Sequence, residues 1–120
     1  MKLRIEPGKI GYRLDFDELE RLLEEGRLEE KLALPRGHLT YRVICRPAGA
    51  KATFETNEQG GEQAGGARFT LSLARDALED HKAALPSLKG IVSVFAGEDR
   101  SPVEVSLEIN LKKKIKRALT

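Results

Sequence analysis

Residues 10–19, Ile-Gly-Tyr-Arg-Leu-Asp-Phe-Asp-Glu-Leu, pass from an alternating pattern into a helical one within a single short stretch. Ile10, Tyr12 and Leu14 lie on one side of an extended chain, which is typical of a half-buried strand. Asp15 follows them and is a favourable helix N-cap, because its carboxylate can accept a hydrogen bond from a free backbone N–H group. The stretch therefore predicts a strand that leads directly into a helix.

The same pattern recurs 59 positions later, in residues 69–78 (Phe-Thr-Leu-Ser-Leu-Ala-Arg-Asp-Ala-Leu). The identical pairs between the two copies are Leu14/Leu73, Asp17/Asp76, Leu19/Leu78 and Glu20/Glu79. Two interpretations stay open: the chain consists of two pseudo-repeated strand-helix halves, or the matches are coincidental in a leucine-rich chain. Either interpretation predicts a second helix over about 75–84, ended by Pro86.

The first helix is expected over residues 16–25. Glu18 stands three places after Asp15, as in a capping box, and Gly26 follows the last periodic residue, where a left-handed C-cap would need it. The apolar residues at helical spacing form one stripe; they are Phe16, Leu19, Leu22 and Leu23.

The remaining segments predict strands. Residues 2–14 are expected to form a hairpin through Pro7-Gly8, and residues 39–46 and 51–56 a second one. Further strands are expected at 28–34, at 69–73, at 91–95 (apolar on both faces, hence central) and at 103–111. The glycine-rich residues 57–66 predict a mobile loop, because they offer no large apolar group to bury.

Together these segments predict an α+β fold in one domain, residues 1–111. Its core would be a mainly antiparallel sheet of about eight strands, with two short helices packed on one side. A chain of 120 residues with 40% hydrophobic residues is sufficient for one core. Cys45 is the only cysteine, no window is apolar enough to span a membrane, and Met1 leads straight into a strand pattern, so a cytoplasmic protein is expected.

The charge of the chain is uneven. The net charge is +2, and residues 112–117 alone contribute +5, so the rest of the chain sums to −3. The basic tail, residues 112–120, is the one segment that suggests a partner. Its candidate contacts to a nucleic acid or to an acidic partner are Lys112, Lys113, Lys114, Lys116 and Arg117. The rest of the chain, residues 1–111, argues against a nucleic acid, because it lacks stacking aromatics and any evident basic stripe. The alternatives are that the tail increases solubility or that it is attracted to the acidic face at residues 15–30.

Catalytic patterns are weak. Cys45 is expected on an apolar strand face, which disfavours a Cys/His nucleophile with His38 or His81. No short-spaced metal ligands occur, and the glycine-rich loop lacks the Gly-Lys-Ser/Thr ending of a phosphate-binding loop. Glu108-x-Asn110-x-Lys112 lacks one carboxylate of the Glu-x-Glu-x-Lys strand that is typical of triphosphate-tunnel enzymes, so it does not predict such an enzyme. We expect no catalytic residues, no metal site and no cofactor.

The N-terminal part of the chain also resembles a known family. Four segments of the chain are similar to the pattern MKIRI…RLRLTxSEV…EGxVEE. They are Met1-Lys2-Leu3-Arg4-Ile5, Tyr12-Arg13-Leu14, Asp17-Glu18-Leu19 and Glu25-Gly26-Arg27-Leu28-Glu29-Glu30. This pattern belongs to a small family of uncharacterised bacterial proteins, a domain of unknown function. The resemblance implies a shared fold and cytoplasmic residence, and it assigns no functional residues.

From the sequence we therefore expect a small, non-enzymatic protein-interaction domain. The expected partner is another protein or a second copy of the chain, bound through an exposed sheet edge. A nucleic-acid-binding accessory protein that uses the basic tail is the alternative. No membrane contact is expected.

Overall fold

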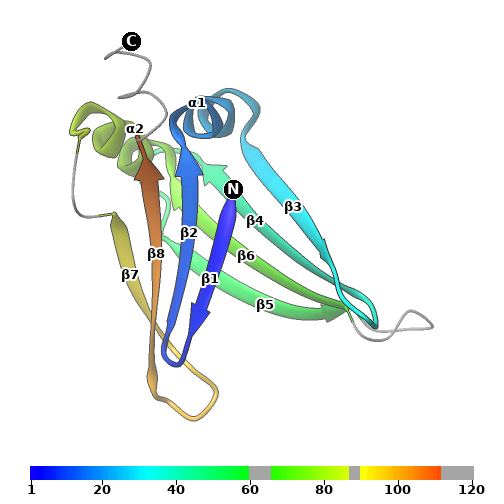
Figure 1. The fold of residues 1–120 in the computed structure, drawn as a ribbon. Helices are drawn as coiled ribbons and strands as arrows, with labels where there is room; N and C mark the ends of the chain where they lie inside the picture. The colour runs from blue at the N-terminus through cyan, green and yellow to red at the C-terminus, as the bar shows by residue number, and fades with distance from the viewer. Residues whose placement is uncertain (60–65, 87–89, 112–120) are drawn as a thin grey trace.

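The chain folds into eight strands and two helices arranged as two four-stranded sheets (Figure 1). The computed structural model describes residues 1–59, 66–86 and 90–111. The elements are β1 (Lys2–Glu6), β2 (Lys9–Asp15), α1 (Phe16–Glu25), β3 (Arg27–Ala33), β4 (His38–Arg46), β5 (Thr53–Gln59), β6 (Gly66–Ala74), α2 (Arg75–Ala83), β7 (Ile91–Ala96) and β8 (Pro102–Asn110). The predicted α+β class, with mostly sheet and two short helices, is confirmed.

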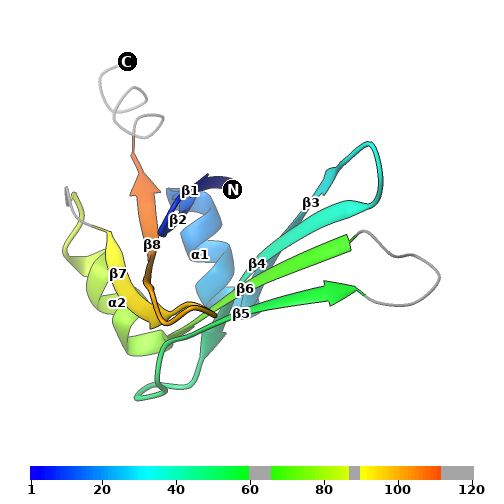
Figure 2. The ribbon, with the colours of Figure 1, turned by 90° about the horizontal axis from the view of Figure 1, so that it is seen from below.

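The strands divide equally between the two sheets. Sheet A has the order β1-β2-β8-β7 and sheet B the order β3-β4-β6-β5. The outer pairs of each sheet are antiparallel, whereas the central pairs, β2 with β8 and β4 with β6, are parallel. Both helices lie at the end where the sheets converge, and the sheets diverge away from them (Figures 1 and 2).

The repeated halves are visible in the order of the elements. Both β1-β2-α1-β3-β4 and β5-β6-α2-β7-β8 follow the order ββαββ, and exchanging the halves converts the strand order of sheet A into that of sheet B. The helices begin 59 positions apart, at Phe16 and Arg75, which is the spacing in the sequence. Each sheet contains one hairpin from each half, so the halves are interleaved.

The first helix forms as its sequence predicts. The Glu18 backbone N–H donates to Asp15 Oδ1 at 2.7 Å, and the Asp15 N–H donates to Glu18 Oε1 at 3.0 Å, which completes the capping box. Gly26 has a φ of 88°, and its N–H donates to the Leu22 carbonyl. The second helix begins at Arg75, and its N-cap residue, Ala74, provides no side-chain hydrogen bond.

One core lies between the sheets and under the helices. Its members come from both halves, and they are buried because strand alternation and the helical stripe place them on the same inner side. They are Tyr12, Leu14, Leu19, Leu22, Leu28, Val43, Leu71, Leu73, Leu78, Val105 and Leu107.

Three expectations from the sequence were wrong in detail. Residues 39–46 and 51–56 do not form a hairpin, because β6, which is buried along much of its length, lies between β4 and β5; the actual hairpins are β3-β4 and β5-β6. Residues 57–59 are not loop: they continue β5 and pair with residues 66–68, since backbone pairing needs no apolar side chain. The rest of that loop, 60–65, lies outside the described residues.

Residues 91–95 were expected to form a central strand, and this third expectation was also wrong. They belong to β7, which is an edge strand of sheet A. Val92 and Val94 are 52% and 64% exposed, because both helices pack on the inner side and leave the outer face of this sheet uncovered.

No helix among the described residues is long and apolar enough to cross a membrane.

Removal of the N-cap tests the local origin of α1. We expect Asp15→Ala to lower the free energy of unfolding by about 1 kcal/mol, because the Glu18 backbone N–H loses its acceptor, Asp15 Oδ1. Asp17→Ala, an exposed residue of the same turn, is the matched control and should change stability by less than about 0.5 kcal/mol. Urea denaturation followed by circular dichroism measures both, and equal effects would contradict the capping role.

Substitution of Tyr12 tests whether a buried hydroxyl without a hydrogen-bond partner destabilises the core. Its side chain is fully buried, and its hydroxyl has no hydrogen-bond partner among the described residues; burial also raises its pKa. We expect Tyr12→Phe to stabilise the protein by about 1 kcal/mol, and Tyr12→Ala to destabilise it by about 3–5 kcal/mol. A loss of stability in Tyr12→Phe, measured by urea denaturation, would show instead that the hydroxyl is hydrogen bonded in solution.

Candidate functional site

The free edge of β7 is the feature of this fold most suited to a partner. Among the described residues, β7 pairs only with β8 and ends the order of sheet A (Figure 1). Its sequence, Ile-Val-Ser-Val-Phe-Ala, contains no charge, no proline and no glycine. Val92 and Val94 point to the outer face, whereas the alternate residues Ile91 and Phe95 pack against the core.

The hairpin after β7 determines which backbone groups are free. The Gly97 N–H donates to the Ser101 carbonyl at 2.7 Å, so these residues form a hydrogen-bonded pair. In an antiparallel ladder, hydrogen-bonded pairs alternate with non-hydrogen-bonded ones. Phe95 and Ser93, opposite Val103 and Val105, are therefore bonded to β8 as well.

The intervening residues have the opposite orientation. The N–H and C=O groups of Val92, Val94 and Ala96 consequently point away from β8, toward the open side of the sheet. Edge backbone groups and exposed valine side chains thus occur on the same residues. This combination presents an extended, apolar template with three donors and three acceptors.

The other three edge strands carry charges that discourage pairing. Charged residues occur in β1 (Lys2, Arg4 and Glu6), in β3 (Arg27, Glu29, Glu30 and Lys31) and in β5 (Glu55 and Glu58). An incoming strand would have to desolvate these groups or accept their repulsion. Among the described edges, β7 alone lacks this protection.

The start and the inner face of β7 are held firmly. Gly90, the residue before β7, lies so close to β8 that an added Cβ would be 2.3 Å from the Leu107 carbonyl oxygen. Only glycine, which has no Cβ, fits at this position. On the inner face, the ring of Phe95 lies 6.2 Å from that of Phe54 in β5, across the gap between the sheets. The strand is therefore anchored on one side and open on the other.

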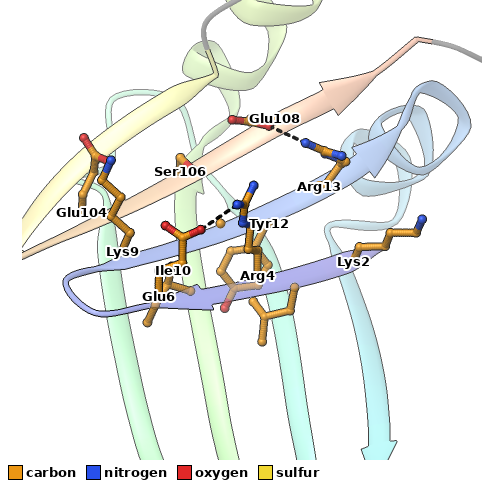
Figure 3. A pocket seen from close by; sticks show the side chains of 12 residues that line it. Lys2, Arg4, Glu6, Lys9, Ile10, Tyr12, Arg13, Glu104, Ser106 and Glu108 are labelled. Carbon is orange, nitrogen blue, oxygen red and sulfur yellow. Dashed lines mark hydrogen bonds and ion pairs between the residues drawn. The ribbon is translucent and has the colours of Figure 1, made fainter.

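A shallow depression of about 450 Å³ lies over β1, β2 and β8 on the outer face of sheet A, and no residue of β7 lines it (Figure 3). Gly11 and Ser106, which face each other across β2 and β8, form its floor. Its walls are ion pairs: Arg4–Glu6 at 2.7 Å, Lys9–Glu104 at 3.8 Å and Arg13–Glu108 at 3.4 Å. Three of the four cations that line the depression therefore already have a carboxylate partner, which leaves only Lys2 without an ion pair among the described residues.

The residues predicted to contact a nucleic acid are not placed. Lys112, Lys113, Lys114, Lys116 and Arg117 lie outside the described residues. The acidic face proposed to attract them is partly engaged: Asp15 and Glu18 form the capping box, and Glu25 lies 3.9 Å from Arg21. The strand before the tail ends at Asn110, opposite Asp15.

His38 and Cys45, two of the residues considered for catalysis, lie apart from each other. His38 begins β4 at its exposed end, and Cys45 lies near the other end, about 23 Å along the strand. Burial raises the pKa of the Cys45 thiol, with Arg75 acting in the opposite direction, and burial lowers the pKa of His81 on α2. Within the described residues, no group of three His, Cys, Asp or Glu side chains could hold a metal ion.

Sequence reasoning missed two features of the surface. The two-sided apolar pattern of residues 91–95 was visible, but it predicted burial, whereas the outer valines are exposed on an edge. The body was expected to lack a basic stripe; this was wrong for sheet B, where β4 and β6 bring Arg42 and Arg68 onto the same outer face. The strand containing Arg68 was expected to begin only at residue 69, whereas β6 begins at Gly66, and the parallel pairing of β4 with β6 could not be foreseen from alternation.

Comparison with known proteins identifies a family but no activity. No curated protein matches the chain, and no solved structure matches it. A family described as "Family of unknown function (DUF7009)" matches residues 1–62, just over half of the chain, from β1 to beyond the end of β5. The chain therefore belongs to this family of unknown function, DUF7009.

Proposed function

We propose that the protein is a non-enzymatic interaction domain that associates with a second copy of itself through β7. The observation that carries this proposal is an uncharged edge strand whose outward valines are 52% and 64% exposed. Exposed edges of this kind are templates for another strand. A second β7 is a fitting partner because it brings the same uncharged, β-branched surface.

Antiparallel pairing of two copies satisfies the free backbone groups. A two-fold axis beside Val94 places Val94 opposite its own counterpart and Val92 opposite Ala96 of the second copy. The new hydrogen bonds would form at Val92, Val94 and Ala96, whose N–H and C=O groups point away from β8. The result is a continuous eight-stranded sheet, with the valine side chains in cross-strand contact on its outer face.

The position of the charges supports this geometry. Glu104, the nearest carboxylate on β8, is opposite Val94 in the register and is already paired with Lys9 at 3.8 Å. No charged residue of β7 would oppose its copy. The pairing would therefore depend on backbone hydrogen bonds and apolar contact more than on attraction between the basic tail and the acidic face.

The remaining expectations from the sequence form part of the same proposal. We place the protein in the cytoplasm of a bacterium, because its N-terminus resembles bacterial proteins and a reducing compartment suits the unpaired Cys45. The raised pKa of that thiol disfavours the thiolate and supports a role other than catalysis.

A charge introduced at the edge tests the proposal. We expect the 13.3 kDa chain to give twice that mass at high protein concentration, and Val94→Lys to remain monomeric, because the two-fold axis would place two ammonium groups side by side. Size-exclusion chromatography with light scattering, from about 5 to 500 µM protein, measures the mass. Ala33→Lys, which adds the same charge to the edge of β3, is the control and should dimerise normally.

Two results would contradict the proposal. One is a wild-type chain that stays monomeric at the highest concentration. The other is a dimer that dissociates in 1 M NaCl, where the Debye length is only about 3 Å, since this would identify charge attraction as the main contribution. Val94→Thr, which retains the branched shape, should weaken the dimer less than Val94→Lys does.

Hydrogen exchange tests the register of the edge. In dilute solution the amides of Val92, Val94 and Ala96 should exchange quickly, whereas those of Ser93 and Phe95 should be protected by β8. At dimer-forming concentration the first set should become protected, with little change in the second. Nuclear magnetic resonance resolves each amide, and protection that rises equally at all five positions would argue for general stabilisation instead of edge pairing.

A further inference from the structure

The outer face of sheet B carries an ordered group of arginine and threonine side chains. Thr40 and Arg42 of β4 and Arg68 and Thr70 of β6 all point outward, because Tyr41, between the first two, packs against the core and Phe69, between the second two, lies against the ring of Phe54 on the inner side. In the parallel register Thr40 is opposite Arg68, and Arg42 is opposite Thr70. Each guanidinium group thus has a threonine as its neighbour on the adjacent strand.

The two threonines are buried although they face outward. Thr40 is 1% exposed and Thr70 is 4% exposed, which requires that the long neighbouring side chains cover them. Arg42 Nε donates a hydrogen bond to Thr70 Oγ1 at 2.8 Å. Arg68 Nε is also buried, and it has no hydrogen-bond partner among the described residues. The side chains of both arginines are therefore held close to the sheet.

The same face has an excess of positive charge. Its basic residues are Arg27, Lys31, Arg42, Arg46 and Arg68, and its acidic residues are Glu29 and Glu55, so five minus two gives +3. Within the described chain, none of these five cations forms an ion pair with a carboxylate. On sheet A, by contrast, Arg4, Lys9 and Arg13 each have such a partner.

We infer that the outer face of sheet B binds the phosphodiester backbone of a double-stranded nucleic acid. Guanidinium groups bind phosphate oxygens with two parallel hydrogen bonds, and they remain charged at every physiological pH. Arginines held at a sheet surface lose little side-chain entropy when they bind. Cations without carboxylate partners need to break no ion pair first.

The absence of aromatic residues from this face specifies the form of the nucleic acid. The outward residues of β3, β4, β5 and β6 include no Phe, Tyr or Trp. Single strands are bound largely by stacking bases on such rings, whereas a duplex presents its phosphates without exposing its bases. The face therefore fits a duplex backbone, contacted without sequence selection. It lies on the opposite sheet from the β7 edge and is independent of the proposed dimer.

Replacing the two central arginines tests this inference. The full chain is titrated into a fluorescent 20-base-pair DNA duplex of arbitrary sequence, and binding is followed by anisotropy from 50 to 200 mM NaCl. Arg42→Gln/Arg68→Gln should weaken binding at 50 mM by roughly 10-fold for each lost phosphate contact, and the salt slope should become shallower by about 1.8. Arg4→Gln/Arg13→Gln removes the same charge from sheet A, and it should leave both values close to wild type.

Further measurements distinguish binding by this face from binding by the basic tail and from an effect of altered folding. Arg42→Lys/Arg68→Lys retains the charge and should preserve most of the salt slope even if the fold is slightly perturbed, and thermal melts of all variants check folding. An intact chain that fails to bind at 50 mM NaCl would overturn the inference. So would equal binding by Arg42→Gln/Arg68→Gln, which would assign binding to the tail. Equal competition by poly-glutamate would indicate an acidic protein partner instead.

Discussion

The parallel pairing of β2 with β8 and of β4 with β6 is the constraint on which the rest of the structure depends. Each pair joins a strand of the first half to a strand of the second, so neither sheet is complete without both halves. The core has the same dependence, because Leu14 and Leu19 from one half pack in one cluster with Leu73 and Leu78 from the other. A half chain would leave the apolar face of its hairpins exposed. The two ββαββ units are thus repeats in arrangement but not independent folding units.

Local features of the fold were predictable because nearest neighbours determine them. The capping box at Asp15 and Glu18, the left-handed Gly26 and the alternation from Val103 to Ile109 each depend on residues a few places apart. Strand order depends on contacts between distant segments, and alternation gives no information about which strand lies beside which. Residues 91–95 illustrate the limit: two apolar faces are compatible with a central strand or with an edge strand that binds a partner. The arginine face of sheet B was hidden for the same reason, since Arg42 and Arg68 become neighbours only through the parallel register.

The two sheets share one backbone arrangement and differ in their surfaces. The outer face of sheet A has four basic residues (Lys2, Arg4, Lys9 and Arg13) and four acidic ones (Glu6, Asp15, Glu104 and Glu108), and three of its cations are in ion pairs. The equivalent face of sheet B has a net charge of +3 and leaves its cations without such pairs among the described residues. Because the fold is the same in both, packing does not account for this difference. The fold requires only the inner faces, and the outer faces are free to carry separate functions.

The same comparison applies to the edges. Exchanging the halves places β7 where β3 stands, yet β3 reads Arg-Leu-Glu-Glu-Lys-Leu-Ala and β7 reads Ile-Val-Ser-Val-Phe-Ala. Four charges protect one edge from pairing, and none protects the other, although both strands occupy equivalent positions beside an antiparallel neighbour. Exposure of Val92 and Val94 is therefore not a requirement of the fold, since Glu29 and Lys31 occupy outward positions on the equivalent strand. An apolar edge that the fold does not require, in a chain that protects its counterpart, is best explained by a partner strand.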